Sequence, residues 1–185
     1  MKKVVFLGLG YIGLPTAAVA AHHGYEVVGV DVNPSVVETV NQGKVHIVEP
    51  DLDKVVKEAV QSGHLRAVSR PEPADAFFVV VPTPFKQNHR ADITYVESAT
   101  RSIIPYLEPG NLFVIESTSP VFTTERMAEL IYQQRPELKD KIYIAYCPER
   151  VLPGNTLYEL VHNDRVIGGI TPASTDKAVE FYSAF

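Results

Sequence analysis

Short apolar runs alternate along the chain with segments whose apolar residues recur at a helical spacing. The runs contain mostly β-branched or large apolar residues. Consecutive apolar positions of this kind are typical of parallel strands that are covered by helices on both faces. Six runs predict buried strands: Val4–Leu7, Val27–Val30, Phe77–Val81, Leu112–Ile115, Ile142–Ala145 and the short run Val166–Ile167.

The segments between the runs predict amphipathic helices. Apolar residues within Leu52–Val60 follow i, i+3, i+4, i+7 spacing, and Asp51 is the expected N-cap. Further helices are expected over 95–103 after Asp92 or Thr94, over 127–134 begun at Thr123 or Thr124, and over Pro172–Phe185. This alternation predicts the α/β class: a Rossmann-type, doubly wound, mostly parallel sheet with helices on both faces.

Three glycines follow the first predicted strand directly, in the sequence GLGYIG. Gly8 permits a tight turn, Gly10 lets a pyrophosphate approach the backbone, and Gly13 allows the next helix to pack closely on the strand. The backbone N–H groups of Tyr11 and Ile12 then face a phosphate at the positive end of that helix. The spacing predicts a dinucleotide site.

A carboxylate stands at the end of the second predicted strand. Asp31 lies 18 residues after Gly13, where it can accept hydrogen bonds from both ribose hydroxyls of an adenosine. Because it would repel a 2′-phosphate, NAD is favoured over NADP as the cofactor. The alternative is a Rossmann-like sheet that holds no cofactor.

Two later strand ends carry threonines that can reach the same ligand. Thr83, in VPTPF, lies beside a ligand at the sheet edge or belongs to an ordinary proline turn. In IESTSPVFTTE, Thr118 can offer its hydroxyl to a ligand or an ordered water. Thr124 is either a cofactor contact or only a helix cap. Capping does not readily explain Glu116 and Ser117.

The single cysteine of the chain, Cys147, stands two residues before Glu149 and three before Arg150. A neighbouring guanidinium lowers the pKa of a thiol and would favour a nucleophile. A cysteine at a strand end also serves as a small buried hydrophobe. The residues alone leave both interpretations open.

The remaining polar groups predict no chemistry. Glu49, Asp51 and Asp53 form an acidic cluster, which we interpret as a solvated helix start rather than an acid/base pair. The six histidines show no metal-ligand spacing with one another or with Cys147, so no metal site is expected.

Composition narrows the class of protein. The 185 residues are 45% hydrophobic, which suffices for a sizeable core, and the net charge is −5 with neutral histidines. A mildly acidic chain is not expected to bind nucleic acid broadly. No apolar run approaches the roughly 20 residues of a membrane span. A single cysteine excludes an intramolecular disulfide and favours a reducing cytoplasm.

Several stretches, taken in order, resemble a known family. They are GLGYIGLPTA, Asp31, VPTPF, ESTSPV, YCPERVLPG and NDRVIGG. They are similar to the N-terminal part of the UDP-glucose/GDP-mannose dehydrogenase family over essentially all 185 residues. The resemblance implies an NAD-dependent four-electron oxidation, in which a sugar C6 alcohol becomes a carboxylate through a cysteine-bound thiohemiacetal and thioester. The family's nucleophilic cysteine and catalytic lysine belong past residue 185, so the resemblance makes Cys147 structural.

Within the family, four stretches are similar to the branch that oxidises UDP-N-acetyl-D-mannosamine for bacterial surface polysaccharides. They are HIVEPDL, TPFK, TYVESATRSI and CPERVLPG. Pro153 also favours this branch, because the corresponding segment of UDP-glucose dehydrogenases has a second glutamate at this position. The alternatives are the same chemistry on UDP-N-acetylglucosamine or UDP-glucose, and a non-catalytic NAD-binding sensor, for which no DNA-binding module is visible.

The resemblance also implies residue roles. Together with the glycine turn, the expected cofactor contacts are Gly8, Gly10, Tyr11, Ile12, Gly13, Asp31, Thr83, Thr118 and Thr124. Thr118 and Glu149 are expected to support catalysis by handling the hydrolytic water. The UDP-sugar substrate is expected to contact Glu149, Arg150 and Val151.

The domain organisation follows from the same resemblance. Residues 1–170 are expected to form the NAD-binding domain and 171–185 the start of a linking or central helix, with central and C-terminal UDP-sugar-binding domains downstream. This chain alone should then bind NAD without turnover. The full-length protein is expected to be a cytoplasmic homodimer, and apolar surface near Tyr182 and Phe185 is expected to be exposed.

Overall fold

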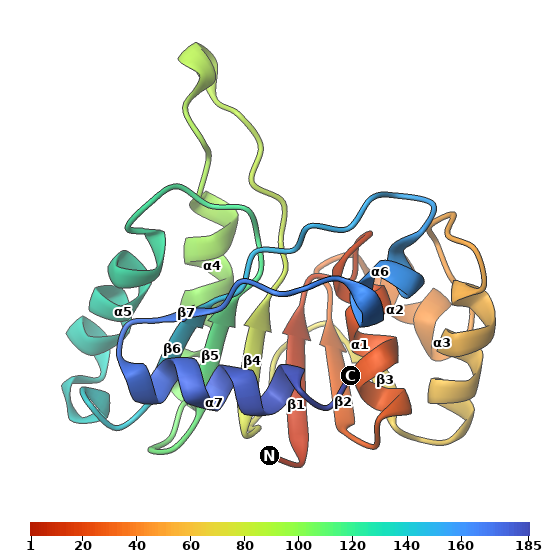
Figure 1. The fold of residues 1–185 in the computed structure, drawn as a ribbon, viewed down its shortest axis with the longest axis horizontal. Coiled ribbons are helices and arrows are strands. Elements are labelled where there is room, and N and C mark those ends of the chain that lie inside the picture. The colour runs from red at the N-terminus through yellow and green to blue at the C-terminus, as the bar shows by residue number, and fades with distance from the viewer.

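The structure is a computed structural model that describes the backbone of residues 1–185 and every side chain except that of Asn88. The described residues form a seven-stranded sheet in the order β3-β2-β1-β4-β5-β6-β7 (Figure 1). Its strands are β1 (Lys3–Leu7), β2 (Glu26–Val30), β3 (Leu65–Val68), β4 (Ala76–Val79), β5 (Leu112–Ile115), β6 (Tyr143–Tyr146) and β7 (Gly168–Gly169).

The strand order reverses once, at the middle of the sheet. From β1 the chain moves outward to β2 and β3, then returns to the other side of β1 and continues through β4, β5 and β6, all in parallel. The short β7 runs antiparallel to β6. Doubly wound folds bind ligands in the crevice that such a reversal opens at the carboxyl ends of the strands. The predicted Rossmann-type α/β fold is confirmed.

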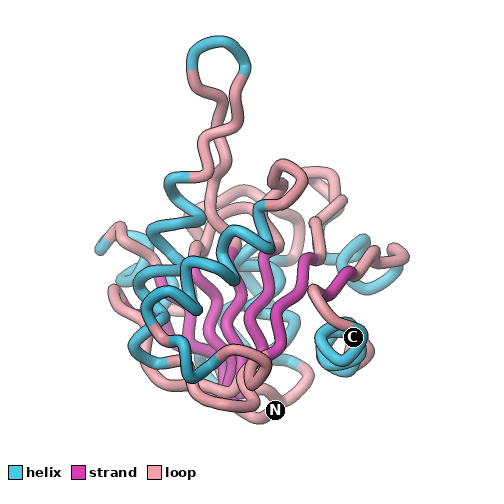
Figure 2. The backbone as a smooth tube through the Cα atoms, turned by 90° about the vertical axis from the view of Figure 1, so that its left-hand side faces the viewer, coloured by secondary structure: helices cyan, strands magenta, loops and turns pink.

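Helices cover both faces of the sheet (Figure 2). One core cluster lies under α1 (Gly13–His22), α2 (Pro34–Asn41), α3 (Leu52–Gln61) and α7 (Pro172–Tyr182); the other lies under α4 (Thr94–Ile103) and α5 (Thr123–Gln134). The remaining helical segments are α6 (Thr156–His162) and the 3₁₀ turns Gln87–His89, Ile104–Tyr106 and Pro136–Leu138. Among the described residues, no helix combines the length and the apolar character that crossing a membrane requires.

The continuous apolar runs have the burial that they predicted. Within β1, Val4 and Phe6 belong to one core cluster, whereas Val5 and Leu7 belong to the other. Successive side chains of a strand point to opposite faces, so a strand covered on both sides needs apolar residues throughout.

Two strands differ from the predicted ones. β3 has no counterpart among the apolar runs because Arg66, which is exposed, interrupts it and only Leu65 and Ala67 are buried. The last strand, predicted at 166–167, lies instead at Gly168–Gly169. There, Ile170 continues the pairing by donating its N–H to the carbonyl of Ile144 at 3.0 Å.

The predicted helix starts lie close to the observed ones, but the residues that cap the helices differ from those predicted. Asp51 precedes α3 in a left-handed conformation (φ 59°) and its side chain caps nothing, so its predicted capping is wrong. At α4, the Asp92 carboxylate accepts from the backbone N–H of Thr94 at 3.0 Å. α5 begins at Thr123, after a left-handed Phe122, without a side-chain cap. α2 was missed, although Asn33 caps it by accepting from the N–H of Ser35 at 3.0 Å.

An arm, residues 82–93, projects from the carboxyl edge of the sheet between β4 and α4 (Figure 1). Its two sides pair through an antiparallel bridge between Phe85 and Ala91. The N–H of Asp92 also donates to the carbonyl of Pro84 at 2.7 Å. This pairing fixes the base of the arm, where Thr83 lies.

α7 is part of the core. Its first turn is capped by Thr171, whose hydroxyl accepts from the N–H of Ser174 at 3.1 Å. Near its end, the ring of Phe181 packs on that of Phe78, with centroids 4.3 Å apart. Tyr182 is 4% exposed and Phe185 is partly buried against the same cluster. The expectation that Tyr182 contributes exposed apolar surface is therefore wrong, because the rings turn toward the sheet.

Replacing Phe181 with alanine should lower the free energy of unfolding by about 3–5 kcal/mol, because it leaves a cavity among packed aromatic rings. Urea denaturation of the purified chain measures this. Val179→Ala, in the same helix but 42% exposed, is the matched control and should cost less than about 1 kcal/mol. Equal losses for the two variants would contradict a core role for α7.

Candidate functional site

A cavity of about 790 Å³ runs along the carboxyl ends of the strands. One end is lined by Gly8, Gly10 and Asp31, and the other by Thr118 and Glu149. This volume lies in the usual range for sites that bind small molecules or cofactors. The strand ends thus bring residues from separate predicted motifs into one continuous crevice.

The glycine turn shapes one wall of the cavity. Gly8 has a left-handed backbone (φ 99°), and a Cβ there would collide with the carbonyl of Val80 on the neighbouring strand exit. A Cβ on Gly13 would collide with the carbonyl of Gly8, so the start of α1 approaches the turn closely. Gly10 faces open space. Tyr11 and Ile12, just before α1, also line the cavity, at a helix start where backbone N–H groups lack intrahelical partners.

Asp31 joins the glycine turn to the next helix start. Its Oδ2 accepts from the backbone N–H of Leu9 at 3.0 Å, and its Oδ1 accepts from the N–H of Asn33 at 2.9 Å. A carboxylate offers about four acceptor positions, so these two bonds hold it in place and leave capacity for a ligand. A half-buried carboxylate at this edge fits a ribose diol.

The residues present therefore fit NAD. The turn admits a diphosphate against bare backbone, because Gly10 has no side chain and space in front of it. The oriented carboxylate of Asp31 stands beside that turn and lines the same cavity. The charge of Asp31 disfavours an additional 2′-phosphate.

The exits of β4 and β5 are tied to each other at the far end of the cavity. The hydroxyl of Thr83 donates to the carbonyl of Thr118 at 2.7 Å, and the N–H of Val81 donates to the Ser117 hydroxyl at 2.9 Å. Thr83, Ser117 and Thr118 all line the cavity. Thr124 lies apart from them, half-buried in the first turn of α5 and outside the described lining of the cavity.

Glu149 is held by an ion pair that sequence analysis did not foresee. Its Oε2 pairs with Nη1 of Arg165 at 3.0 Å, and the two side chains are 9% and 13% exposed. Its Oε1 accepts from the backbone N–H of Arg150 at 2.7 Å. Glu149 and Val151 line the cavity, whereas Arg150 is exposed outside that lining. The sequence contains one sign of this pairing, because Arg165 belongs to NDRVIGG, one of the stretches that carry the family resemblance.

Glu116, which helix capping does not explain, is a second carboxyl at the cavity. It lines the cavity, is 2% exposed, and its Oε1 accepts from the hydroxyl of Tyr182 at 2.5 Å. Its Oε2 has no hydrogen-bond partner among the residues that the structure describes. Burial raises the pKa of this carboxyl to about 7; Tyr182 and Arg165 oppose the shift and Glu149 adds to it.

Cys147 does not have the character of a nucleophile. It is 1% exposed in the core cluster under α1 and α7. Burial, with the nearby carboxyl of Glu116, raises the pKa of its thiol to about 11, so the thiolate is scarce at neutral pH. Of the two open interpretations, the structure supports the small buried hydrophobe.

Glu49 corrects one interpretation of the acidic cluster. It is 7% exposed rather than solvated, and its Oε1 accepts from the backbone N–H of Gly154 at 2.8 Å. Asp51 and Asp53 are exposed, as expected. The bond joins the stretches HIVEPDL and CPERVLPG, which lie 105 residues apart at the two bonded positions. Glu49 therefore anchors the loop that carries Glu149.

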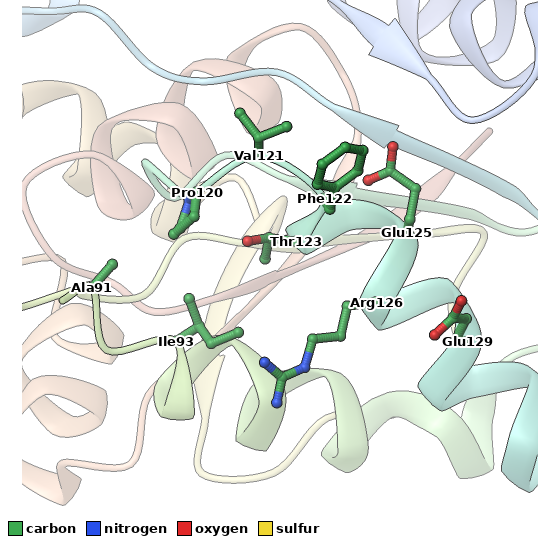
Figure 3. A pocket seen from close by; sticks show the side chains of 9 residues that line it. All are labelled: Ala91, Ile93, Pro120, Val121, Phe122, Thr123, Glu125, Arg126 and Glu129. Carbon is green, nitrogen blue, oxygen red and sulfur yellow. The ribbon is translucent and has the colours of Figure 1, made fainter.

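A second cavity of about 610 Å³ lies between the base of the arm and the start of α5 (Figure 3). Pro120, Val121 and Phe122 form one side of it and Ile93 the other, and Arg126 reaches toward α4, where it pairs with Glu97. None of the predicted site residues lines this cavity in the described structure. The described residues also contain no group of three or more potential metal ligands.

Comparisons with known proteins identify the relatives of the chain. The family model described as "UDP-glucose/GDP-mannose dehydrogenase family, NAD binding domain" matches residues 2–185. The chain is 55% identical to a UDP-N-acetyl-D-mannosamine dehydrogenase from Yersinia pestis and 52% identical to an NDP-N-acetyl-D-galactosaminuronic acid dehydrogenase from Ralstonia nicotianae. Each alignment covers 100% of the chain but only 46% and 45% of the relative. The chain therefore spans about half the length of these relatives.

Solved structures agree with the sequence relatives. A UDP-N-acetyl-mannosamine dehydrogenase from Staphylococcus aureus superposes with a TM-score of 0.95 at 40% identity, over 100% of this chain and 45% of the other. A ternary complex of GDP-mannose dehydrogenase from Pseudomonas aeruginosa superposes with a TM-score of 0.87 at 28% identity, over 99% of this chain and 44% of the other.

Replacing Glu116 with glutamine should remove a pH dependence of stability. The folded carboxyl keeps its proton up to about pH 7, whereas the unfolded one loses it near its ordinary pKa of 4.5. The free energy of unfolding of the unaltered chain should therefore fall as pH rises through this window. The fall that Glu116 contributes is on the order of 3 kcal/mol.

Urea denaturation at several pH values measures the difference between Glu116→Gln and the unaltered chain. Glu129→Gln, an exposed position on α5, is the control and should follow the unaltered chain. If the Glu116→Gln curve ran parallel to that of the unaltered chain, Glu116 would titrate like a solvated carboxyl.

Proposed function

Because the chain belongs to the UDP-glucose/GDP-mannose dehydrogenase family, we propose that it is the NAD-binding part of a nucleotide-sugar 6-dehydrogenase. The proposed reaction is the four-electron oxidation of UDP-N-acetyl-D-mannosamine to UDP-N-acetyl-D-mannosaminuronate. One observation carries the proposal: a single cavity joins Gly10 and Asp31 at one end to Thr118 and Glu149 at the other. A cofactor lying along it would place its reactive ring beside polar groups suited to a sugar.

At the cofactor end of the cavity, backbone groups and one carboxylate are proposed to bind NAD. Gly8, Gly10 and Gly13 keep side chains away from the diphosphate, and the amides of Tyr11 and Ile12 offer it donors at the start of α1. Asp31, fixed by two backbone N–H groups, accepts from the adenosine ribose. When bound, NAD supplies the hydride acceptor of the reaction.

The reacting end is assembled by the exits of β4, β5 and β6. The Thr83–Thr118 bond holds the two threonines beside the nicotinamide half. Arg165 holds Glu149 as an oriented carboxylate, which suits it to bind the sugar and, with Thr118, to orient the water that hydrolyses an acyl intermediate.

Three further residues are proposed to contact a ligand. Val151 lines the cavity and is proposed to touch the sugar nucleotide. Arg150 is proposed to do the same from its exposed position beside Glu149. Thr124 is proposed as a cofactor contact that a ligand would have to approach from the side of α5.

The choice of sugar rests on the relatives and on one contact. Relatives at 55% and 52% identity carry different sugar names, so identity alone discriminates little. The Glu49–Gly154 bond joins two of the stretches that favour the N-acetylmannosamine branch. UDP-N-acetylglucosamine and UDP-glucose are the alternative substrates. A non-catalytic NAD sensor is less well supported, because it gives no use to Glu149, which lines the cavity and is held there by Arg165.

The wider organisation is proposed from the same relatives. Residues 1–170 serve as the NAD-binding domain, 171–185 begin a linking helix, and further domains of the full-length protein bind the UDP-sugar and supply the nucleophile and the lysine. We place the full-length protein in the cytoplasm as a homodimer that serves surface-polysaccharide synthesis. The buried free cysteine is compatible with a reducing compartment.

Replacing Asp31 with alanine should weaken NAD binding at least about tenfold, because charge-assisted hydrogen bonds to ribose hydroxyls are lost. Binding of NADP should weaken less or improve, so the ratio of the two affinities falls. Isothermal titration calorimetry of this chain with both nucleotides measures the ratio. Asp53→Ala, an exposed acid on α3, should leave it unchanged.

Because Asp31 also holds two backbone amides, Asp31→Asn is the milder companion variant. It retains an acceptor oxygen but loses the charge. A ratio that stays at its original value in both Asp31 variants would remove the carboxylate from nucleotide selection.

The full-length protein should reduce NAD with UDP-N-acetyl-D-mannosamine faster than with UDP-N-acetylglucosamine or UDP-glucose, when NADH absorbance is followed at equal substrate concentrations. This chain alone should bind NAD and show negligible turnover. Enzyme-like turnover by this chain would contradict the proposed division of roles. A preference for another of the three sugars would reassign the substrate.

A further inference from the structure

We propose that Glu116 exchanges a proton with the solvent in step with the charge of the nicotinamide ring. In this proposal it is a carboxylate when the cationic ring of NAD⁺ lies in the cavity and a carboxylic acid when the neutral ring of NADH lies there. The inference rests on the proposed function and assigns a role to a side chain that the functions proposed above do not use.

Glu116 lies where such coupling is expected. It follows β5 directly and lines the same cavity as Thr118 and Glu149. The strand carrying it lies two strands from β1, or roughly 10 Å at the usual spacing. A dinucleotide whose diphosphate lies at the glycine turn after β1 would extend its nicotinamide half in this direction.

One oxygen of Glu116 is available for a proton. Tyr182, from α7, donates its hydroxyl to Oε1 at 2.5 Å. Oε2 is buried and has no hydrogen-bond partner among the described residues. An ionised oxygen buried in this way is costly, so with neutral surroundings Oε2 holds the proton. The residue is 2% exposed, so protein atoms rather than bulk water surround its carboxyl, and a charge in the adjoining cavity acts on it with little screening by solvent.

The charged and titratable groups around Glu116 leave its charge undecided. Arg165 lies near it but is already paired with Glu149 at 3.0 Å, so these two charges largely offset each other. Cys147 after β6 and Tyr182 on α7 have pKa values raised by burial, and both are neutral at pH 7. With its own pKa at about 7, Glu116 can take either form at little cost.

A cationic ring in this cavity would favour the ionised form, as any opposite charge nearby lowers the pKa of a carboxyl. Linkage makes the effect reciprocal: ionised Glu116 strengthens the binding of NAD⁺, and protonated Glu116 favours NADH. When an alcohol is oxidised, its C–H bond gives two electrons and hydrogen to the ring as hydride, and its O–H bond releases one proton. The ring loses its positive charge, and Glu116 takes up one proton from the cavity or the solvent.

Proton-linked calorimetry tests the inference on this chain. NAD⁺ and NADH are titrated separately at pH 6, 7 and 8, each in two buffers that differ in ionisation enthalpy. NAD⁺ binding should release up to one proton near pH 6–7, and its affinity should rise with pH by a factor that approaches tenfold per pH unit at most. NADH binding should release none, and its affinity should stay level or fall.

Glu116→Gln keeps the size and the hydrogen-bonding capacity of the side chain and removes the titration. It should bind NAD⁺ without proton release and with an affinity that does not change with pH. Tyr182→Phe removes the bond that lowers the pKa of Glu116, so the same release should move to higher pH. A merely structural Glu116 would change affinities without changing the proton count. Glu129→Gln should match the unaltered chain throughout.

The infrared carbonyl band of a protonated carboxylic acid gives a second measurement that needs no variant. This band should weaken when NAD⁺ binds and persist when NADH binds. NAD⁺ binding to the unaltered chain without proton release, or release that persists in Glu116→Gln, would overturn the inference while leaving the proposed function intact. Failure of both nucleotides to bind would overturn the proposed function together with it.

Discussion

The close approach of Gly13 to the carbonyl of Gly8 is the constraint on which the rest of this site depends. It brings α1 against the exit of β1 and leaves no room for a side chain at position 13, while the carbonyl of Val80 excludes one at position 8. The turn between them is thereby exposed to the crevice, with Gly10 open in front. Asp31 then bonds back to this turn through the N–H of Leu9. The proposed diphosphate and ribose sites therefore form one rigid unit.

Parallel strand ends convert that local unit into a long site. Since β1, β4, β5 and β6 all end at the same edge, each exit loop adds its polar residues to one crevice. The hydrogen bond from Thr83 to Thr118 links the loops after β4 and β5 directly. The partly buried ion pair of Glu149 with Arg165 continues the series one strand further. The order of the parallel strands thus brings polar side chains that are far apart in the sequence into one cavity.

The parts that sequence predicted are those whose causes are local. Gly8 and Asp31 could be predicted to lie at one edge of the sheet because a strand, a turn, a helix and a second strand follow one another directly in the sequence. β3 was missed because Arg66 breaks its apolar run, although β2 supplies the pairing that makes it a strand. The bonds from Tyr182 to Glu116 and from Gly154 to Glu49 join positions 66 and 105 residues apart. Neither pairing leaves a periodic trace in the sequence, since each depends on how distant elements pack.

The position of α7 has a mechanical consequence. Its last residues, Phe181 and Tyr182, are wedged among core rings, and the same turn of helix holds a carboxyl on the floor of the crevice. A sideways slip or rotation of this helix would therefore strip Glu116 of its one hydroxyl donor. The packing position of α7 therefore controls how readily Glu116 gives up its proton. A force that displaces the helix near residue 185 would change the proton affinity of this carboxyl.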